Sequence, residues 1–280
     1  MKFADPTNDI AFKKIFGDEK KSEILISFLN AILDFKGNDK IKSISIANPY
    51  QVPKIEDLKN TILDIKATDN NNNSFIVEMQ VEKDRDFAKR SLYYTSKAYV
   101  SQIDKAQNYR LLQKVYFIGI LNFSIFQNSD YISRHLILDT KTLKQEVGDF
   151  DFTFIELSKF NKDISNINTI ADKWIYFIKN ASSFELIPDQ FQDTKEFLEA
   201  FDIAHRYTWT KEEDDLYEYI SMNEGIKENS IITAREEGKE EGKKQKAIEI
   251  AKKMLAKNSD VDMIIEFTGL SENEIKEIIF

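Results

Sequence analysis

The chain has 280 residues, of which 42% are hydrophobic, and a formal net charge of −9. This hydrophobic content predicts a globular chain with one large core or two modest cores, and it argues against disorder. The chain contains no cysteine and two distant histidines, His135 and His205, which excludes disulfides and argues against a zinc site. Carboxylates are therefore the only plausible metal ligands.

No segment approaches 18 consecutive apolar residues, and the N-terminus lacks a basic and apolar signal pattern. We therefore expect a cytoplasmic protein with no membrane partner. The charge is unevenly distributed, because residues 1–150 hold 22 Lys/Arg against 20 Asp/Glu and residues 151–280 hold 17 against 28. DNA affinity depends on neutralising phosphates, so the acidity argues against DNA binding in the second half only.

Helices and strands alternate through the first half of the chain. The pattern predicts helices at Asp9–Phe16 and Lys20–Leu33, a strand at Ile41–Ile46, two strands within Leu63–Val81, a helix at Asp84–Lys105, and strands at Val115–Leu121, His135–Asp139 and Phe152–Leu157. The run Val115–Leu121 is continuously apolar, which is typical of a fully buried strand. Strands flanked by helices predict a mixed sheet in an α/β architecture.

The two strands within Leu63–Val81 carry unusual polar residues. They are joined by a segment rich in Asp, Asn and Ser, which is typical of a turn, so they are expected to pair as a hairpin. Residues two apart on a strand share a face, so Asp64 shares one with Lys66. Glu78 likewise shares one with Gln80. Such polar groups are costly to bury alone, and two neighbouring carboxylates repel unless a cation joins them, so the pattern predicts a metal site.

Magnesium is the ion that best suits these side chains. Mg²⁺ takes oxygen ligands, usually one or two carboxylates together with waters and substrate phosphate. Asp64 and Glu78 fit that set, with the Met79 backbone carbonyl as a further ligand. Gln80 and Lys66 would then lie where a polar group orients a water or holds a phosphate oxygen. The alternative is that both acids are solvent-facing strand residues paired with nearby lysines, and that Lys66 is a solvated strand lysine.

The stretch Lys83–Lys114, which follows these strands, holds eight basic residues against three acidic ones. Its predicted helix places Arg90, Tyr93 and Lys97 three or four residues apart, where they could contact a DNA backbone. The alternative is a solvated basic helix with half-buried tyrosines. Lys13, on the first predicted helix, is a further candidate DNA contact. Apolar residues of the basic helix are expected to face the core: Phe87, Leu92, Tyr94, Ala98 and Ile103.

From Ser165 onward the pattern is helical. Two apolar stripes at helical spacing are expected to lie in a core: Ile170, Trp174, Phe177 and Ile178, then Phe191, Phe197, Phe201 and Ala204. Met222–Leu255 contains a long charged helix with few apolar residues, in which Gly238 and Gly242 each cost about 1 kcal/mol. We expect a flexible, solvent-exposed connector there.

The last residues form a predicted compact unit of two short helices around a Thr268–Gly269 turn. Ser271 and Glu274 make a capping box that opens the last helix. Two such helices resemble half of a helix-turn-helix, but the last helix is acidic where a recognition helix should be basic. We therefore favour a packing or oligomerisation element, with a homo-oligomer formed through the C-terminal helices.

Three blocks of this sequence together resemble the Rpn family, described as recombination-promoting nucleases or PD-(D/E)XK nuclease family transposases. The blocks are Asp5–Gly17, Leu63–Val81 and Arg90–Tyr99. The most specific part is Asp-x-Lys-Ala…Glu-Met-Gln, in which Gln80 replaces the usual Lys. The resemblance covers about residues 1 to 255. It implies a restriction-endonuclease-like (PD-(D/E)XK) mixed sheet flanked by helices, a helical C-terminal region and metal-dependent DNA cleavage.

The same resemblance implies roles for single residues. Asp64 matches the motif aspartate and Glu78 the second acid. Asp9 matches an acidic residue on the first helix that can approach the metal in this superfamily, with a plain helix cap as the alternative. The neutral amide of Gln80 cannot stabilise a phosphorane as a cation does, although the Glu-x-Gln form occurs in the family. Lys66 could supply the missing charge.

These inferences predict four regions: a PD-(D/E)XK nuclease core at 1–160, a helical extension packing on it at 161–222, a charged helical connector at 223–258 and a small helical tail at 259–280. The predicted function is Mg²⁺-dependent DNA endonuclease, with Mn²⁺ as a possible substitute, associated with recombination or mobile elements. The alternatives are a catalytically inactive relative that binds DNA or proteins, and an RNA nuclease.

Overall fold

The computed structural model describes residues 3–47, 50–51, 61–62, 64–104 and 106–279. Two boundary residues of the predicted elements, Leu63 and Lys105, lie outside the described residues. The chain divides into two compact units, Met1–Glu218 and Tyr219–Phe280. The first unit is an α/β structure and the second is helical.

A six-stranded mixed sheet forms the centre of the first unit, with strand order β1-β4-β5-β6-β8-β7. Its strands are β1 (Ile44–Ala47), β4 (Ile65–Asp69), β5 (Ser74–Gln80), β6 (Val115–Leu121), β7 (Ile132–Leu136) and β8 (Phe150–Glu156). The three strands β5, β6 and β8 are parallel, and the other neighbours pair antiparallel. A separate two-stranded sheet pairs β2 (Tyr50–Gln51) with β3 (Thr61–Ile62).

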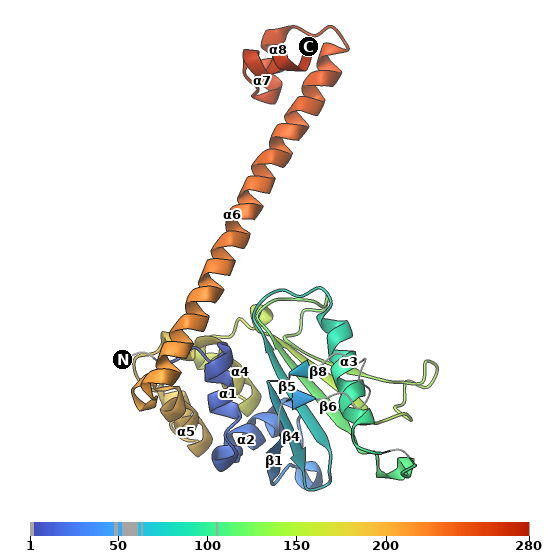
Figure 1. Cartoon of the computed structure of the whole chain (residues 1–280), viewed down its shortest axis with the longest axis vertical. Coiled ribbons are helices and arrows are strands. Elements are labelled where there is room, and N and C mark those ends of the chain that lie inside the picture. The colour runs from blue at the N-terminus through green and yellow to red at the C-terminus, as the bar shows by residue number, and fades with distance from the viewer. Residues whose placement is uncertain (1–2, 48–49, 52–60, 63, 105, 280) are drawn as a thin grey trace. The chain divides into compact units, whose positions relative to one another are not determined.

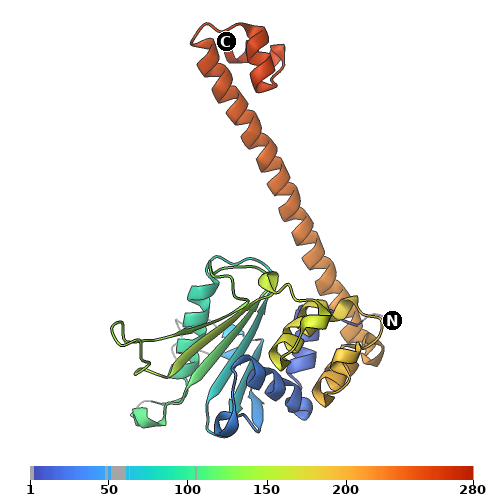
Figure 2. The ribbon, with the colours of Figure 1, turned by 180° about the vertical axis from the view of Figure 1, so that it is seen from behind.

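Helices cover both faces of the sheet, which confirms the predicted α/β architecture. On one face lies α3 (Phe87–Val100), and on the other lie α1 (Asp9–Phe16), α2 (Ser22–Ile32), α4 (Ile170–Asn180) and α5 (Lys195–Ala204) (Figure 1). From behind, α3 remains on the opposite side of the sheet from the blue and yellow helices (Figure 2). Because both of its faces are covered, β6 is buried along all seven residues, as its apolar run predicts.

The larger core lies between the sheet and the four helices α1, α2, α4 and α5. Trp174 and Phe197 pack there with ring centroids 4.2 Å apart, and both are fully buried. The predicted helical stripes are therefore core residues, except Ile170, which is 41% exposed at the start of α4. A second core lies under α3, where Phe87 and Ala98 pack against β6 and β8. Leu92, predicted to face this core, is 54% exposed instead.

Three strand predictions are shifted along the chain, and the one expected at Phe152–Leu157 is β8, Phe150–Glu156. The strand expected at His135–Asp139 is β7. Its pairing with β8 runs from Ile132, opposite Ile155, to Leu136, opposite Asp151, so the strand begins and ends three residues earlier than expected. By contrast, β1 begins at Ile44. Ile41 is held outside the sheet by the Asn30 side chain, which hydrogen-bonds both its N–H (2.8 Å) and its C=O (2.9 Å).

The helix α6 runs continuously from Lys211 to Leu255, so residues of both units belong to it. Exposed ion pairs between side chains three or four residues apart accompany its charged stretch, including Lys253–Glu249 at 2.5 Å. Gly238 does not interrupt the helix, and a Cβ there would meet nothing within 4 Å.

In the second unit, α7 (Val261–Thr268) and α8 (Glu272–Ile279) pack on the end of α6 around four buried residues: Ala251, Ile264, Leu270 and Ile275. Gly269 ends α7 in the left-handed conformation at φ +70°. Ser271 and Glu274 form the predicted capping box, with the Ser271 N–H donating to Glu274 at 2.9 Å and the Glu274 N–H donating back at 3.3 Å.

Among the described residues, no helix is long and apolar enough to cross a membrane.

Candidate active site

The pairing of β4 with β5 brings Asp64 and Glu78 together. Ile65 lies opposite Val77, so Asp64, one residue before β4, falls opposite Glu78. The Asp64 N–H donates to Glu78 Oε1 at 3.2 Å, and the Met79 N–H donates to Asp64 Oδ2 at 2.7 Å. The two acids are therefore neighbours, held by backbone hydrogen bonds at the end of a strand pair.

Both acids are withdrawn from water. Glu78 is 6% exposed and the Asp64 side chain 16%, which rules out the alternative of solvent-facing strand residues. Burial raises the pKa of Asp64 to about 6, against the lowering effect of the Met79 N–H. Burial and then the Asp64 charge raise the pKa of Glu78 to about 8. The ionised Asp64 thus raises the pKa of Glu78, and the charge of Asp9 adds to the rise at Asp64.

A lysine from α1 compensates part of this charge. Lys13 Nζ lies 2.7 Å from Asp9 and 3.5 Å from Asp64 Oδ1, and its charge lowers the pKa of both Asp64 and Glu78. Lys13, a candidate DNA contact from sequence, is therefore a neighbour of the acids. Asp9 does not cap α1, because the Asn8 side chain does so by accepting from the Ile10 N–H at 3.0 Å.

Gln80 and Arg90 meet on the other side of the acids. The Gln80 Oε1 accepts from Arg90 Nη2 at 2.5 Å, and the Gln80 Nε2 donates to the Glu82 carbonyl at 3.0 Å. Arg90 Nη1 also lies 2.9 Å from Asp84 Oδ2. The Arg90 charge lowers the pKa of Glu78, so this guanidinium acts electrostatically on the candidate site.

The remaining predicted site residues on the strands and on α3 are Lys66, Tyr93 and Lys97. Lys66 shares the α3-facing side of the sheet, because it lies opposite Ile76, but within the described structure its side chain forms no ion pair. Burial alone lowers its pKa. Tyr93 is 37% exposed on α3, and desolvation lowers the pKa of the half-buried Lys97.

Asp84 has no clear sequence signal, whereas the helical spacing of Tyr94 predicts that it faces the core of α3. Asp84 pairs with Arg90 across a loop and the first turn of α3. Tyr94 lies under the Arg90 guanidinium at 5.8 Å, and desolvation raises its pKa, with Glu78 and Asp64 adding to the rise. The spacing of Asp9 and Lys13, four residues apart on a helix, could have predicted their ion pair.

The donor set fits a hard divalent cation. Asp64 and Glu78 offer neighbouring carboxylate oxygens of low water exposure. Mg²⁺ needs one or two carboxylates, with waters and phosphate oxygens completing its shell. Among the described residues, no group of three or more His, Asp or Glu side chains is arranged to hold a metal. Asp9 would have to release Lys13 before it could act as a third ligand.

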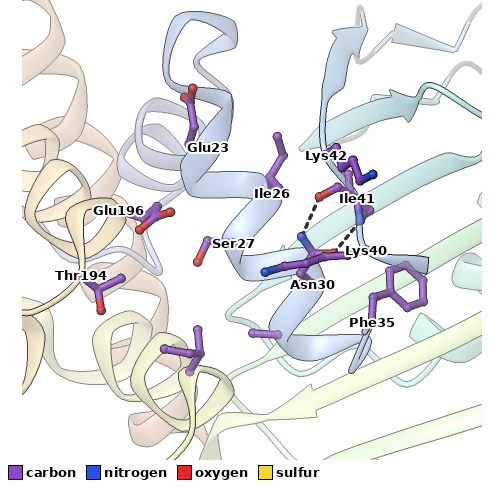
Figure 3. Close-up of a pocket in the computed structure, with 12 residues that line it drawn as sticks. Glu23, Ile26, Ser27, Asn30, Phe35, Lys40, Ile41, Lys42, Thr194 and Glu196 are labelled. Atoms are coloured by element: carbon purple, nitrogen blue, oxygen red, sulfur yellow. Dashed lines mark hydrogen bonds between the residues drawn. The ribbon is translucent and has the colours of Figure 1, made fainter. Parts of the chain in front are cut away.

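A pocket that neither acid lines lies between α2, α5 and the segment before β1 (Figure 3). It measures about 620 Å³, and none of the candidate site residues lines it. Glu23 and Glu196 line one part, and Lys40 and Lys42 another. The Asn30 amide in its wall is engaged with the backbone of Ile41, so its role there is structural.

Comparison with known proteins agrees with the fold. Residues 6–234 match the model of the PD-(D/E)XK nuclease family transposase. The chain belongs to this family. The mixed six-stranded sheet with flanking helices is consistent with the PD-(D/E)XK fold. No curated protein and no solved structure matches the chain.

A second match covers residues 244–279, which correspond to the C-terminal HTH domain of the Rpn/YhgA-like nuclease family. It includes the end of α6 with α7 and α8, the three helices that share one small core. The helix-turn-helix interpretation, second to a packing element in the sequence analysis, is therefore the one that the match supports. Helix-turn-helix domains place a helix in the major groove, so the match indicates a DNA partner.

Proposed function

We propose that this protein is a metal-dependent DNA endonuclease that hydrolyses phosphodiester bonds in recombination or in the movement of genetic elements. The observation that carries the proposal is the buried pair Asp64 and Glu78, held together by backbone hydrogen bonds at a strand end. The nuclease-family match and the helix-turn-helix match support the same conclusion from independent segments.

Asp64 and Glu78 would hold the ion, which we propose to be Mg²⁺ with Mn²⁺ as a substitute. A divalent cation in this place would favour ionisation of water and neutralise charge on the phosphate. The Met79 carbonyl and Asp9 are proposed further ligands. The cation would also offset the burial that raises the pKa of both carboxylates, and the repulsion that Asp64 exerts on Glu78.

In the hydrolysis itself, a water oxygen bonds to phosphorus, an ester P–O bond breaks and the departing oxygen takes up a proton. The chain must therefore hold the phosphate and its developing negative charge. Arg90, Tyr93 and Lys97 on α3 are the proposed contacts with the DNA backbone. Lys13, on α1, partly neutralises the negative charge of the acids before the substrate binds.

Plasmid nicking tests the proposal. Wild-type protein should nick supercoiled DNA with Mg²⁺ or Mn²⁺ and not in excess EDTA. Asp64→Asn and Glu78→Gln, which keep the side-chain shape, should each lower the rate by at least about 100-fold. Glu146→Gln, at an exposed acid away from the site, is the matched control and should nick normally.

Cleavage that persists in EDTA or in both acid variants would refute the proposal. DNA binding by the wild type without cleavage under any of these ions would instead favour the inactive relative. Faster cleavage of RNA than of DNA of the same sequence would make the protein an RNA nuclease that uses the same acids.

A further inference from the structure

The position that carries lysine in the PD-(D/E)XK motif is occupied by the neutral Gln80, and both ends of its amide are engaged by the protein. Its Oε1 accepts from Arg90 Nη2 and its Nε2 donates to the Glu82 carbonyl. The reverse orientation would set the amide oxygen against a carbonyl oxygen and its NH₂ against a guanidinium, so these partners fix the assignment. Gln80 is thus committed to holding Arg90.

The Arg90 guanidinium is fixed on three sides. Gln80 binds Nη2, Asp84 lies 2.9 Å from Nη1, and the cation lies over the Phe87 ring at 5.0 Å and the Tyr94 ring at 5.8 Å. The Arg90 side chain is 32% exposed. Among the described residues, its buried Nε has no hydrogen-bond partner. A planar donor held in this way has lost most of its rotamer entropy and keeps further N–H groups for an oxyanion.

The other two cations near the motif are less suited to this role. Lys13 is bound to Asp9 and Asp64, so its charge serves the carboxylates. Burial lowers the pKa of Lys66, which disfavours its charged form, whereas Arg90 lowers the pKa of Glu78. A lysine at position 80 would also place its ammonium beside the Arg90 guanidinium, which explains why a neutral acceptor suits this site.

We propose that Arg90 replaces the missing motif lysine: it binds a non-bridging oxygen of the scissile phosphate, and Gln80 is the positioning residue that aims it. This inference rests on the proposed nuclease function and refines it. Gln80 then does not orient the attacking water. Arg90 acts at the reacting phosphate, whereas the sequence analysis placed it among contacts with the DNA backbone at large.

The two roles for Arg90 predict different kinetics. A general backbone contact would raise KM for DNA and leave kcat unchanged, whereas a contact made at the scissile phosphate as charge develops lowers kcat. For Arg90→Met we expect kcat to fall at least about 100-fold, the usual effect of removing one donor to a developing oxyanion. Arg90→Lys, which keeps the charge and loses the planar fork, should lie in between.

A rescue variant separates this role from a structural one. In the Arg90→Met background, Gln80→Lys restores the usual motif and should recover at least about tenfold in kcat. The matched control is Lys89→Met, which removes the neighbouring cation on α3, whose side chain is 85% exposed; it should behave as wild type. Mn²⁺ binding by calorimetry and a cooperative thermal unfolding transition should both be retained in the Arg90 and Lys89 variants, because neither residue is a proposed ligand.

Three results would overturn the inference. One is a kcat for Arg90→Met within threefold of wild type while Asp64→Asn is inactive, which would leave the nuclease proposal intact. Another is an inactive Arg90→Met that also loses Mn²⁺ binding or melts early and is not rescued by Gln80→Lys. If wild type and Asp64→Asn are equally inactive, the proposed function itself fails and the role of Arg90 fails with it.

Discussion

At the scale of single residues, the site is dominated by two carboxylates that the fold keeps close and dry. Backbone N–H groups hold one oxygen of each, and the cations Lys13 and Arg90 approach from α1 and α3. These interactions favour the ionised forms, but burial outweighs them, because the pKa values remain above those of free acids. The protein without metal is therefore electrostatically strained at this point.

This strain predicts how stability depends on pH. The folded pKa of Glu78, about 8, lies above its unfolded value, so between these values the folded state binds more protons than the unfolded state. The free energy of unfolding of the metal-free protein should therefore fall as pH rises through 7 towards 8.5. Urea denaturation in EDTA measures this slope.

Glu78→Gln is the control for that slope, because it removes the titrating group and should flatten the curve over the same range. Adding Mg²⁺ at pH 8.5 should raise the stability of the wild type far more than that of Glu78→Gln. An equal slope in both proteins would show that Glu78 does not carry the pH dependence.

At the scale of elements, the approach of α3 to the sheet decides where Arg90 lies. Gly119 on β6 is paired with Glu78 on β5. A Cβ at Gly119 would come within 2.9 Å of the Phe154 ring and 3.0 Å of the Phe87 ring. The missing side chain therefore lets the first turn of α3 pack closely on the sheet beside the candidate site.

Gly119→Ala should destabilise the protein by about 1–3 kcal/mol, because the added methyl group overpacks this contact. It should also lower kcat for nicking, since α3 carries Arg90. Denaturation and nicking measure the two effects. Gly238→Ala, where the Cβ meets no atom within 4 Å, is the matched control and should leave activity unchanged. A fully stable and active Gly119→Ala would contradict this account of the packing.

At the scale of the whole molecule, the two units carry different features. The candidate catalytic residues all belong to the first unit, and the helix-turn-helix match belongs to the second. The acidic α8 has Glu272, Glu274 and Glu277 against one Lys276, so any DNA contact of this domain would not rest on strong phosphate attraction by that helix. The α-helical homo-oligomer expected from sequence stays a prediction.

Disruption of the small core of the second unit should weaken DNA binding without lowering the rate of the chemical step. Ile275→Ala removes a fully buried side chain, typically worth about 2–5 kcal/mol. We expect DNA affinity to fall and kcat at saturating DNA to hold, as measured by fluorescence anisotropy and nicking. Met263→Ala, on the same unit with 49% exposure, should change neither. Lost kcat with unchanged affinity would refute this division.

The sequence by itself determined the local elements whose signals are short-range. The helix α1 spans Asp9–Phe16 as predicted, because Asn8 caps its start and Gly17 follows its end. The hairpin of β4 and β5 and the buried β6 follow from alternation, turn residues and an apolar run. Where pairing sets the limits, as for β7, the sequence placed the strand too late.

Only the tertiary structure decided which charges stand beside Asp64 and Glu78. Lys13 reaches them from α1 and Arg90 from α3, and neither distance along the chain nor residue type announces this. Burial lowers the pKa of Lys66, although it lies only two residues from Asp64 in sequence. Periodicity reports which face a side chain takes on its own element, whereas electrostatic partners depend on how separate elements dock, which is a property of the packed core.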